Sequence, residues 1–81
     1  MDEGRIETTM GMCVVALTKH LMKKQNLNYE KAYKKLLNME LFKLLTDSET
    51  RLFLETNEYL YEACDRELED GVEVLYEFIN S

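Results

Sequence analysis

The one histidine and the two cysteines are the first candidates in this chain for acid–base, nucleophilic or metal chemistry. His20 follows Cys13 by seven residues, which on a helix is two turns and about 10 Å, too far for both side chains to bind one metal ion without a third ligand between them. A histidine that acts as a general base also needs a partner that orients its ring, and the sequence identifies none. We therefore interpret His20 as a partly exposed structural residue.

The rest of the sequence holds no motif for nucleophilic or phosphate chemistry. It lacks a glycine-rich phosphate loop, a GxSxG elbow and an ordered set of Ser, His and Asp. Cys13 and Cys64 do not form a CxxC pair, and in a chain without an export signal we expect two reduced, packed thiols. We predict a protein without enzymatic activity, catalytic residues, a bound metal ion or a cofactor.

Carboxylates gather in the second half of the chain, and four of them share one face of a predicted helix. Their spacing of i, i+4, i+7 and i+11 places Glu58, Glu62, Asp65 and Glu69 in one stripe opposite the apolar residues. No loop of the EF-hand kind arranges these oxygens around a cation. We interpret this acidic stripe as a solvated face, or as a docking surface for a basic partner.

Lysines gather in the first half instead. Residues 19–43 hold seven lysines and two acids, and Lys31, Lys34 and Lys35 form a candidate basic patch. A helix-turn-helix interpretation fails because the second helix would be short and apolar, whereas a helix that reads DNA needs polar contacts to bases. An isoelectric point near 4.7 also argues against general DNA binding. A nucleic-acid-associated regulator that uses residues 19–43 stays as the alternative function.

Apolar residues recur at helical spacing through the first half, which predicts three helices that position these charges. Thr8 or Thr9 would cap the first helix, which would end near Asn26. Asn28 would cap the second and Asn38 the third. The second and third helices are predicted over residues 29–37 and 39–45.

The segment after residue 45 is a buried crossing between two helical halves. Residues 50–54 are predicted either as an extended segment with Leu52 and Leu54 on one side, or as a helical turn that Asp47 or Ser48 caps and that runs to Glu55. Both alternatives bury apolar side chains at the centre of the molecule.

Two further helices are predicted beyond the crossing. Thr56 or Asn57 would cap the fourth helix, and Gly71 would end it. Residues 72–79 fit both a helix and a strand by period. We favour the helix because eight terminal residues cannot form a sheet alone, and pairing with residues 50–54 is the alternative.

These segments together resemble a group of short bacterial helical proteins of unknown function. The resemblance is carried by residues 28–32, 41–45, 47–55 and 58–61, in which a capped helix precedes an acid-x-Glu-Thr-x-Leu-x-Leu segment and a Tyr-Leu-Tyr helix. It covers about residues 14–68 and implies a compact, cytoplasmic bacterial domain. It implies no reaction, ligand or catalytic residue.

The fold class we predict is all-α, a compact bundle of four to five short helices, with residues 1–8 as a flexible N-terminal tail and residues 9–81 as a single helical domain. No apolar run is long enough to span a membrane, and we expect a cytoplasmic protein.

Methionines and tyrosines exceed what so small a core needs, and these residue types also serve adaptable interfaces. They are Met10, Met12, Met22, Met39, Tyr59, Tyr61 and Tyr76. We therefore expect a small regulatory or protein–protein interaction domain that binds a protein partner or itself, through the first helix or through the acidic stripe.

Overall fold

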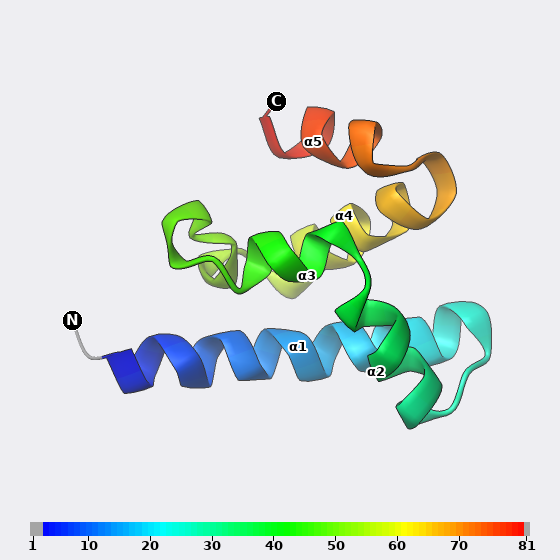
Figure 1. Ribbon diagram of the computed structural model, residues 1–81, viewed down its shortest axis with the longest axis horizontal. Coiled ribbons are helices and arrows are strands. Elements are labelled where there is room, and N and C mark those ends of the chain that lie inside the picture. The colour runs from blue at the N-terminus through cyan, green and yellow to red at the C-terminus, as the bar shows by residue number, and fades with distance from the viewer. Residues whose placement is uncertain (1–2, 81) are drawn as a thin grey trace.

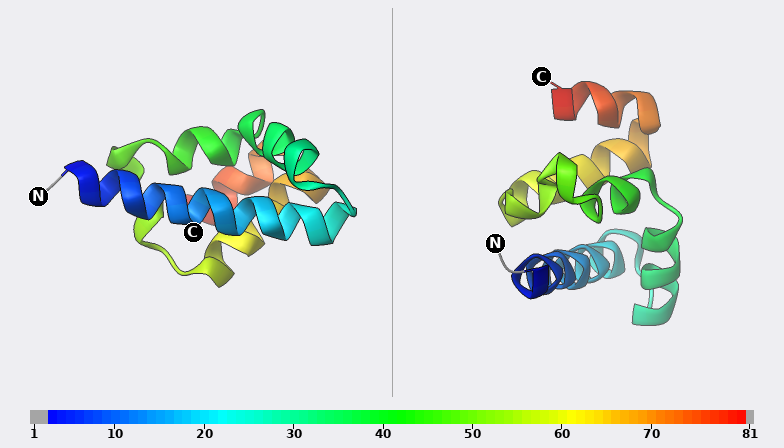
Figure 2. Two further views of the ribbon diagram at one scale, coloured as in Figure 1. Left: turned by 90° about the horizontal axis from the view of Figure 1, so that it is seen from below. Right: turned by 60° about the vertical axis from the view of Figure 1, so that its left-hand side comes forward.

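The computed structural model describes the backbone of residues 3–80 and the side chains of residues 8–80. Over this part of the chain it contains five α-helices, two short 3-10 turns and no strand, which confirms the predicted all-α bundle (Figure 1). The elements are α1 (Glu3–Gln25), α2 (Tyr29–Leu37), α3 (Glu40–Leu45), η1 (Ser48–Thr50), η2 (Leu52–Leu54), α4 (Asn57–Asp70) and α5 (Val72–Asn80). They form three levels, with α1 and α2 at one edge, α3 and α4 in the middle, and α5 at the other edge (Figure 2).

Helix α1 begins earlier than the sequence analysis predicted. It starts at Glu3, so the expected cap at Thr8 or Thr9 is wrong, and residues 3–8, predicted as a tail, are helical; residues 1–2 of that tail lie outside the described part. Once a packed helix has formed, each added residue contributes one hydrogen bond at little further entropic cost, and an acid near the first turn suits the helix dipole.

The end of α1 and the start of α2 follow local capping rules. Asn26 adopts a left-handed conformation with φ of 54°, and the N–H of Leu27 donates to the carbonyl of Met22 over 3.1 Å, as in a Schellman motif. The side chain of Asn28 then accepts a hydrogen bond from the N–H of Lys31, which confirms Asn28 as the predicted cap. The long helix therefore reverses into α2 over three residues.

The predicted cap of α3 is wrong. Asn38 instead ends α2, where its side-chain amide donates to the carbonyl of Lys34, and Met39 holds the cap position of α3 without a side-chain hydrogen bond. The free N–H groups of Glu40 and Leu41 donate to the carboxylate of Glu67, each over 2.8 Å. Because this carboxylate comes from α4, the cap is formed by tertiary structure and has no local sequence signal.

The crossing between the two halves is helical, so its predicted extended form is wrong. Leu52 and Phe53 are both buried within η2, while Leu54 is 63% exposed. An extended strand would point adjacent side chains to opposite faces and expose one of the first two, whereas the 3-10 turn buries both. Arg51, with φ of 57°, separates η1 from η2.

The last two helices match the favoured predictions. The hydroxyl of Thr56 caps α4 by accepting from the N–H of Tyr59. Gly71 ends α4 with φ of 94°, a conformation that disfavours any residue with a Cβ. Residues 72–80 are helical, and Leu75 is fully buried. With no strand available in the described residues, the backbone of this segment bonds within its own helix.

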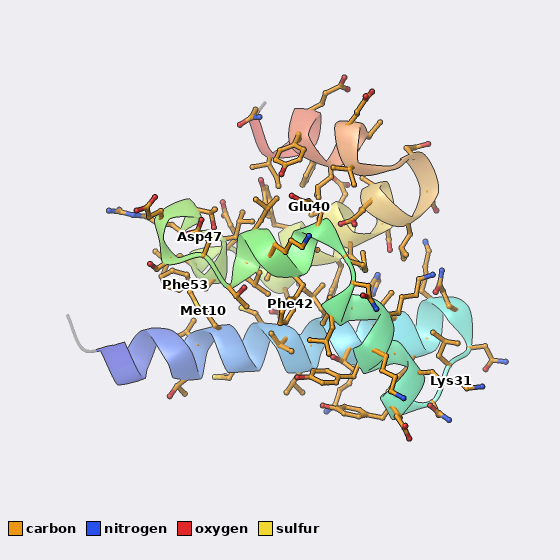
Figure 3. The ribbon with its side chains drawn as sticks, viewed as in Figure 1. Met10, Lys31, Glu40, Phe42, Asp47 and Phe53 are labelled. Atoms are coloured by element: carbon orange, nitrogen blue, oxygen red, sulfur yellow. The ribbon has the colours of Figure 1, made fainter. Side chains whose placement is uncertain are left out.

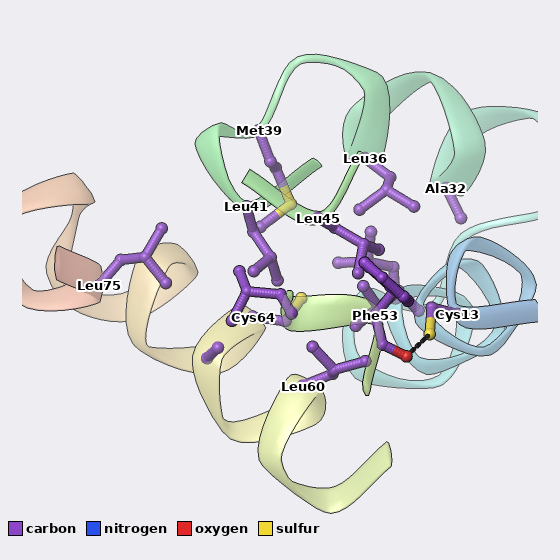
Figure 4. Packing of buried hydrophobic residues seen from close by; sticks show 14 residues of the cluster. Cys13, Ala32, Leu36, Met39, Leu41, Leu45, Phe53, Leu60, Cys64 and Leu75 are labelled. Carbon is purple, nitrogen blue, oxygen red and sulfur yellow. Dashed lines mark hydrogen bonds between the residues drawn. The ribbon is translucent and has the colours of Figure 1, made fainter. Parts of the chain in front are cut away.

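The core joins side chains from every α-helix and from η2 (Figure 4). Its buried apolar residues are Cys13, Leu17, Leu21, Ala32, Leu36, Met39, Leu41, Leu45, Leu52, Phe53, Leu60, Ala63, Cys64 and Leu75. Met10 and Phe42 pack against this cluster, from α1 and α3 respectively (Figure 3). Leu41, Leu45, Leu52 and Phe53 belong to this cluster, but residues 46–51 between them are mostly exposed, so the predicted buried crossing is only partly correct.

Candidate functional site

His20 has an orienting partner that the sequence analysis did not identify. Its Nε2 lies 2.8 Å from Oδ1 of Asp65, a residue 45 positions further along the chain. The imidazole also stacks on the ring of Tyr61, with centroids 4.5 Å apart and planes 8° from parallel. These contacts join α1 to α4. A carboxylate and an aromatic ring of α4 hold the imidazole in place, so His20 has a structural role in the packing of α1 against α4.

The acidic stripe does not form one free surface. Asp65 also lies 3.4 Å from the ammonium group of Lys24, and Glu69 lies 3.3 Å from the same group. The hydrogen bond to Glu69 and the charge of Asp65 raise the pKa of Lys24. Glu62 pairs with Arg66 on its own helix, and Glu58 is exposed. Half of the stripe therefore serves the contact between α4 and α1.

The basic patch is exposed, and among the described residues no ion pair joins it to the acidic stripe. Lys31, Lys34 and Lys35 all lie on α2, and Figure 3 shows Lys31 at the α2 end of the molecule. The ammonium group of Lys34 pairs with Glu30 over 3.2 Å. The acids of α4 pair instead with Lys24, near the end of α1.

Both thiols are buried, as predicted, and neither is disulfide-bonded. The Cys13 thiol donates to the carbonyl of Phe53 over 3.7 Å (Figure 4), and burial raises its pKa. Burial, followed by the nearby charges of Asp65 and Glu67, raises the pKa of Cys64 to about 12. The thiolate is the nucleophilic form, so both groups are held unreactive near neutral pH. Among the described side chains, no cluster of three or more His, Cys, Asp or Glu residues could hold a metal ion.

Two hollows, of about 620 and 560 Å³, lie along α1. The first is lined by Thr8, Gly11, Met12, Val15, Ala16, Lys19 and Tyr61. The second is lined by Lys19, His20, Met22, Lys23, Tyr29 and Tyr61. The hollows share Lys19 and Tyr61 and therefore adjoin, and we call the two together the α1 groove. It runs along α1 beside Tyr61 of α4 and Tyr29 of α2.

Exposed apolar side chains line this groove. Met12 is 69% exposed, Val15 41% and Tyr29 47%. Tyr29 stacks on Tyr33 with ring centroids 6.3 Å apart, so a pair of aromatic rings stands at one end of the groove. Large apolar groups of this kind, gathered in one depression, are typical of a surface that another molecule covers.

Helical spacing alone does not show that these residues stay exposed. Tyr29 and Tyr33 share an apolar stripe of α2, but only Ala32 and Leu36 of that stripe are buried. Met12 was named among the methionines that suit either a core or an interface. A signal was available in the sequence, because apolar residues from Met10 to Leu17 are too continuous for one face of a helix to bury.

Comparisons with protein-family models, with curated proteins and with solved structures gave no match for this chain. Within the described residues, no helix combines the length and the apolar character that a bilayer crossing requires.

Proposed function

We propose that this chain is a non-enzymatic interaction domain that binds another protein chain along the α1 groove. The observation that carries this proposal is the pair of adjoining hollows along α1, in which the apolar side chains of Met12, Val15 and Tyr29 are exposed. Covering Met12, Val15 and Tyr29 would remove apolar area from water, at about 25 cal/mol per Å². This gain is the driving force of most protein association.

The α1 groove supports this function better than the acidic stripe does. Asp65 and Glu69 already pair with Lys24, so a basic partner would have to compete with an internal cation for half of the stripe. In the groove, by contrast, Met12, Val15 and Tyr29 stay exposed among the described residues. The partner therefore meets α1, one of the two surfaces that the sequence suggested.

A nucleic-acid regulator has less support. Lys34 of the basic patch pairs with Glu30, and the chain carries a net charge of −6, which repels a phosphate backbone at long range. Enzymatic chemistry is not part of the proposal, because both thiols are held in their neutral form. We place the protein in the cytoplasm, where buried, unpaired thiols stay reduced.

A photoreactive amino acid placed at single positions in the intact chain, expressed in its native cells, tests this function. We expect the chain with this amino acid in place of Met12 to form a discrete heavier adduct on irradiation. The same replacement at Leu54, which is similarly exposed but lies on η2 outside the groove, is the matched control and should form none. Equal or absent adducts at the two positions, in folded protein, would contradict the proposal.

A further inference from the structure

We propose that Met12 is a redox-sensitive modification site, at which oxidation of the thioether to a sulfoxide releases the partner from the α1 groove and reduction restores binding. This inference rests on the proposed function and adds a means of regulating it. It holds for any partner chain whose apolar side chains cover Met12.

Met12 is the one exposed methionine among the side chains that the structure describes. It is 69% exposed, whereas Met39 is 5% exposed and lies in the core. Met10 and Met22 are partly buried and pack against the same core. Because an oxidant in solution must touch the sulfur atom, it reaches Met12 before the other three.

The two thiols do not compete with Met12 for the oxidant. Cys13 and Cys64 are both buried, and burial raises the pKa of each thiol, so the thiolate is scarce near neutral pH. Oxidation of a cysteine by peroxide begins from the thiolate. Among the described side chains, Met12 is therefore the sulfur group that a mild oxidant modifies first.

The oxidant is a peroxide, and the step transfers one oxygen atom to the sulfur. A lone pair of the sulfur attacks one peroxide oxygen, the S–O bond forms as the O–O bond breaks, and with hydrogen peroxide the other oxygen leaves as water. The sulfur loses the two electrons that the peroxide gains. Methionine sulfoxide reductases reverse the step with two thiols, which become a disulfide while the sulfoxide oxygen leaves as water.

The sulfoxide changes the groove where the groove is most apolar. Met12 lines the first hollow beside Gly11, Val15 and Ala16, none of which has a polar side chain. A partner that covers this part of the groove removes the Met12 side chain from water. Removing a sulfoxide from water costs free energy that removing a thioether does not, so oxidation weakens the association.

The fold itself does not depend on the oxidation state of Met12. Its side chain faces solvent, and a change at such a position has little effect on stability. A sulfoxide at Met39 would instead place a polar group in the core and destabilise the bundle. Met12 can therefore be oxidised and reduced while the protein stays folded, as a regulatory site requires.

Peptide mass spectrometry after treatment of the purified, folded protein with hydrogen peroxide tests the order of oxidation. Among the four described methionines, we expect fragment ions to place the first added oxygen on Met12, about tenfold faster than on Met22 or Met39. The melting curve measured by circular dichroism should stay unchanged, and methionine sulfoxide reductases with a dithiol should remove the oxygen. Faster oxidation of Met10, Met22, Met39 or either thiol would overturn the inference.

A photoreactive amino acid at Val15, which lines the same hollow and is 41% exposed, reports partner binding in native cells while position 12 is varied. Met12→Gln places a polar side chain of similar size there and should lower the yield of the adduct about tenfold. The matched control Met12→Leu stays apolar and should keep the yield. Brief peroxide treatment should lower the yield with Met12 present and leave it unchanged in Met12→Leu.

The possible outcomes distinguish a failure of this inference from a failure of the proposed function. An adduct at Val15 that withstands both Met12→Gln and peroxide would overturn the inference and leave the proposed function intact. A loss on peroxide treatment that persists in Met12→Leu would place the sensitive group in the partner and would also overturn it. If folded protein forms no adduct at either Val15 or Met12, the proposed function falls together with the inference.

Discussion

Cys64 shows how the surroundings of one residue remove its chemistry. Its side chain is fully buried beside two acidic residues, Asp65 and Glu67, which raises the pKa of the thiol to about 12 against an ordinary value of 9.0. The folded state therefore keeps the proton at pH values where the unfolded chain releases it. The stabilisation from this difference is complete below pH 9 and is lost as the pH rises toward 12, at up to about 1.4 kcal/mol per unit of pH.

We predict that the free energy of unfolding falls between pH 9 and pH 11 more steeply in the native protein than in Cys64→Ala. The variant has no thiol to ionise at this position, although it is less stable at neutral pH because of the cavity it creates. Urea unfolding curves of both proteins at several pH values measure the two slopes. Parallel slopes would show that the Cys64 thiol ionises as easily in the folded state as in the unfolded state.

For single residues, the sequence predicted which side chains are buried better than it predicted which side chains pair with one another. Cys13, Leu17 and Leu21 lie on one helical face, a spacing that predicts burial, and all three are buried. The pairing of His20 with Asp65 depends on how α1 meets α4, and no local pattern encodes that meeting. The exposure of Met12 could not be predicted for a related reason, because an apolar side chain suits a core and an interface equally well.

Among the helices, α3 depends most on the rest of the fold. It has six residues, too few to be stable alone, and its first N–H groups are satisfied by Glu67 of α4 rather than by a neighbour in sequence. Charge-assisted hydrogen bonds of this kind are stronger than those between neutral groups. A carboxylate near the end of α4 is unfavourable for the dipole of that helix, and the N–H groups of α3 that donate to it offset this cost.

We expect Glu67→Ala to lower the stability of the protein by about 1–3 kcal/mol, because it leaves two N–H groups of α3 unpaired in a half-buried position. Glu67→Gln keeps one acceptor oxygen and should cost less. Glu69→Ala is the matched control, since Glu69 is 61% exposed and pairs with Lys24 at the surface, so we expect less than about 1 kcal/mol. Chemical denaturation followed by circular dichroism ranks the three variants, and an equal loss for Glu67 and Glu69 would argue against the cap.

This contrast also explains which helix boundaries could be predicted. Asn28 and Thr56 cap through N–H groups three residues further on, so the signal is contained within four residues of sequence. The cap of α3 comes from 27 residues away, and its prediction at Asn38 failed. Sequence patterns therefore identified the locally encoded helices well, and the candidate groove, which depends on the packing of α1, α2 and α4, only in part.

At the scale of the whole molecule, α5 completes a single core rather than forming an appendage. Leu75 is fully buried in the same cluster as Leu17 of α1, although the two helices lie at opposite edges of the bundle (Figure 2). A chain of this size has little apolar area to spare, so the loss of either side chain affects the whole fold.

We predict that Leu75→Ala lowers stability by about 2–5 kcal/mol and that the variant still unfolds in one transition. Val72→Ala, at an exposed position of the same helix, should change stability by less than about 1 kcal/mol. Thermal unfolding followed both by circular dichroism and by tyrosine fluorescence provides the measurement. Early and separate melting of α5 would show that it is not part of the common core.

The position of α4 late in the sequence affects how the chain is made. The buried stripe of α1 packs against α2, η2 and α4, and α4 begins only at Asn57. While the ribosome is still synthesising the middle of the chain, α1 therefore exposes two apolar faces, the one that will join the core and the one that will line the groove. A nascent chain that stops before Asn57 should be held by chaperones that recognise apolar helices, and one that includes α4 should be released with only the groove exposed.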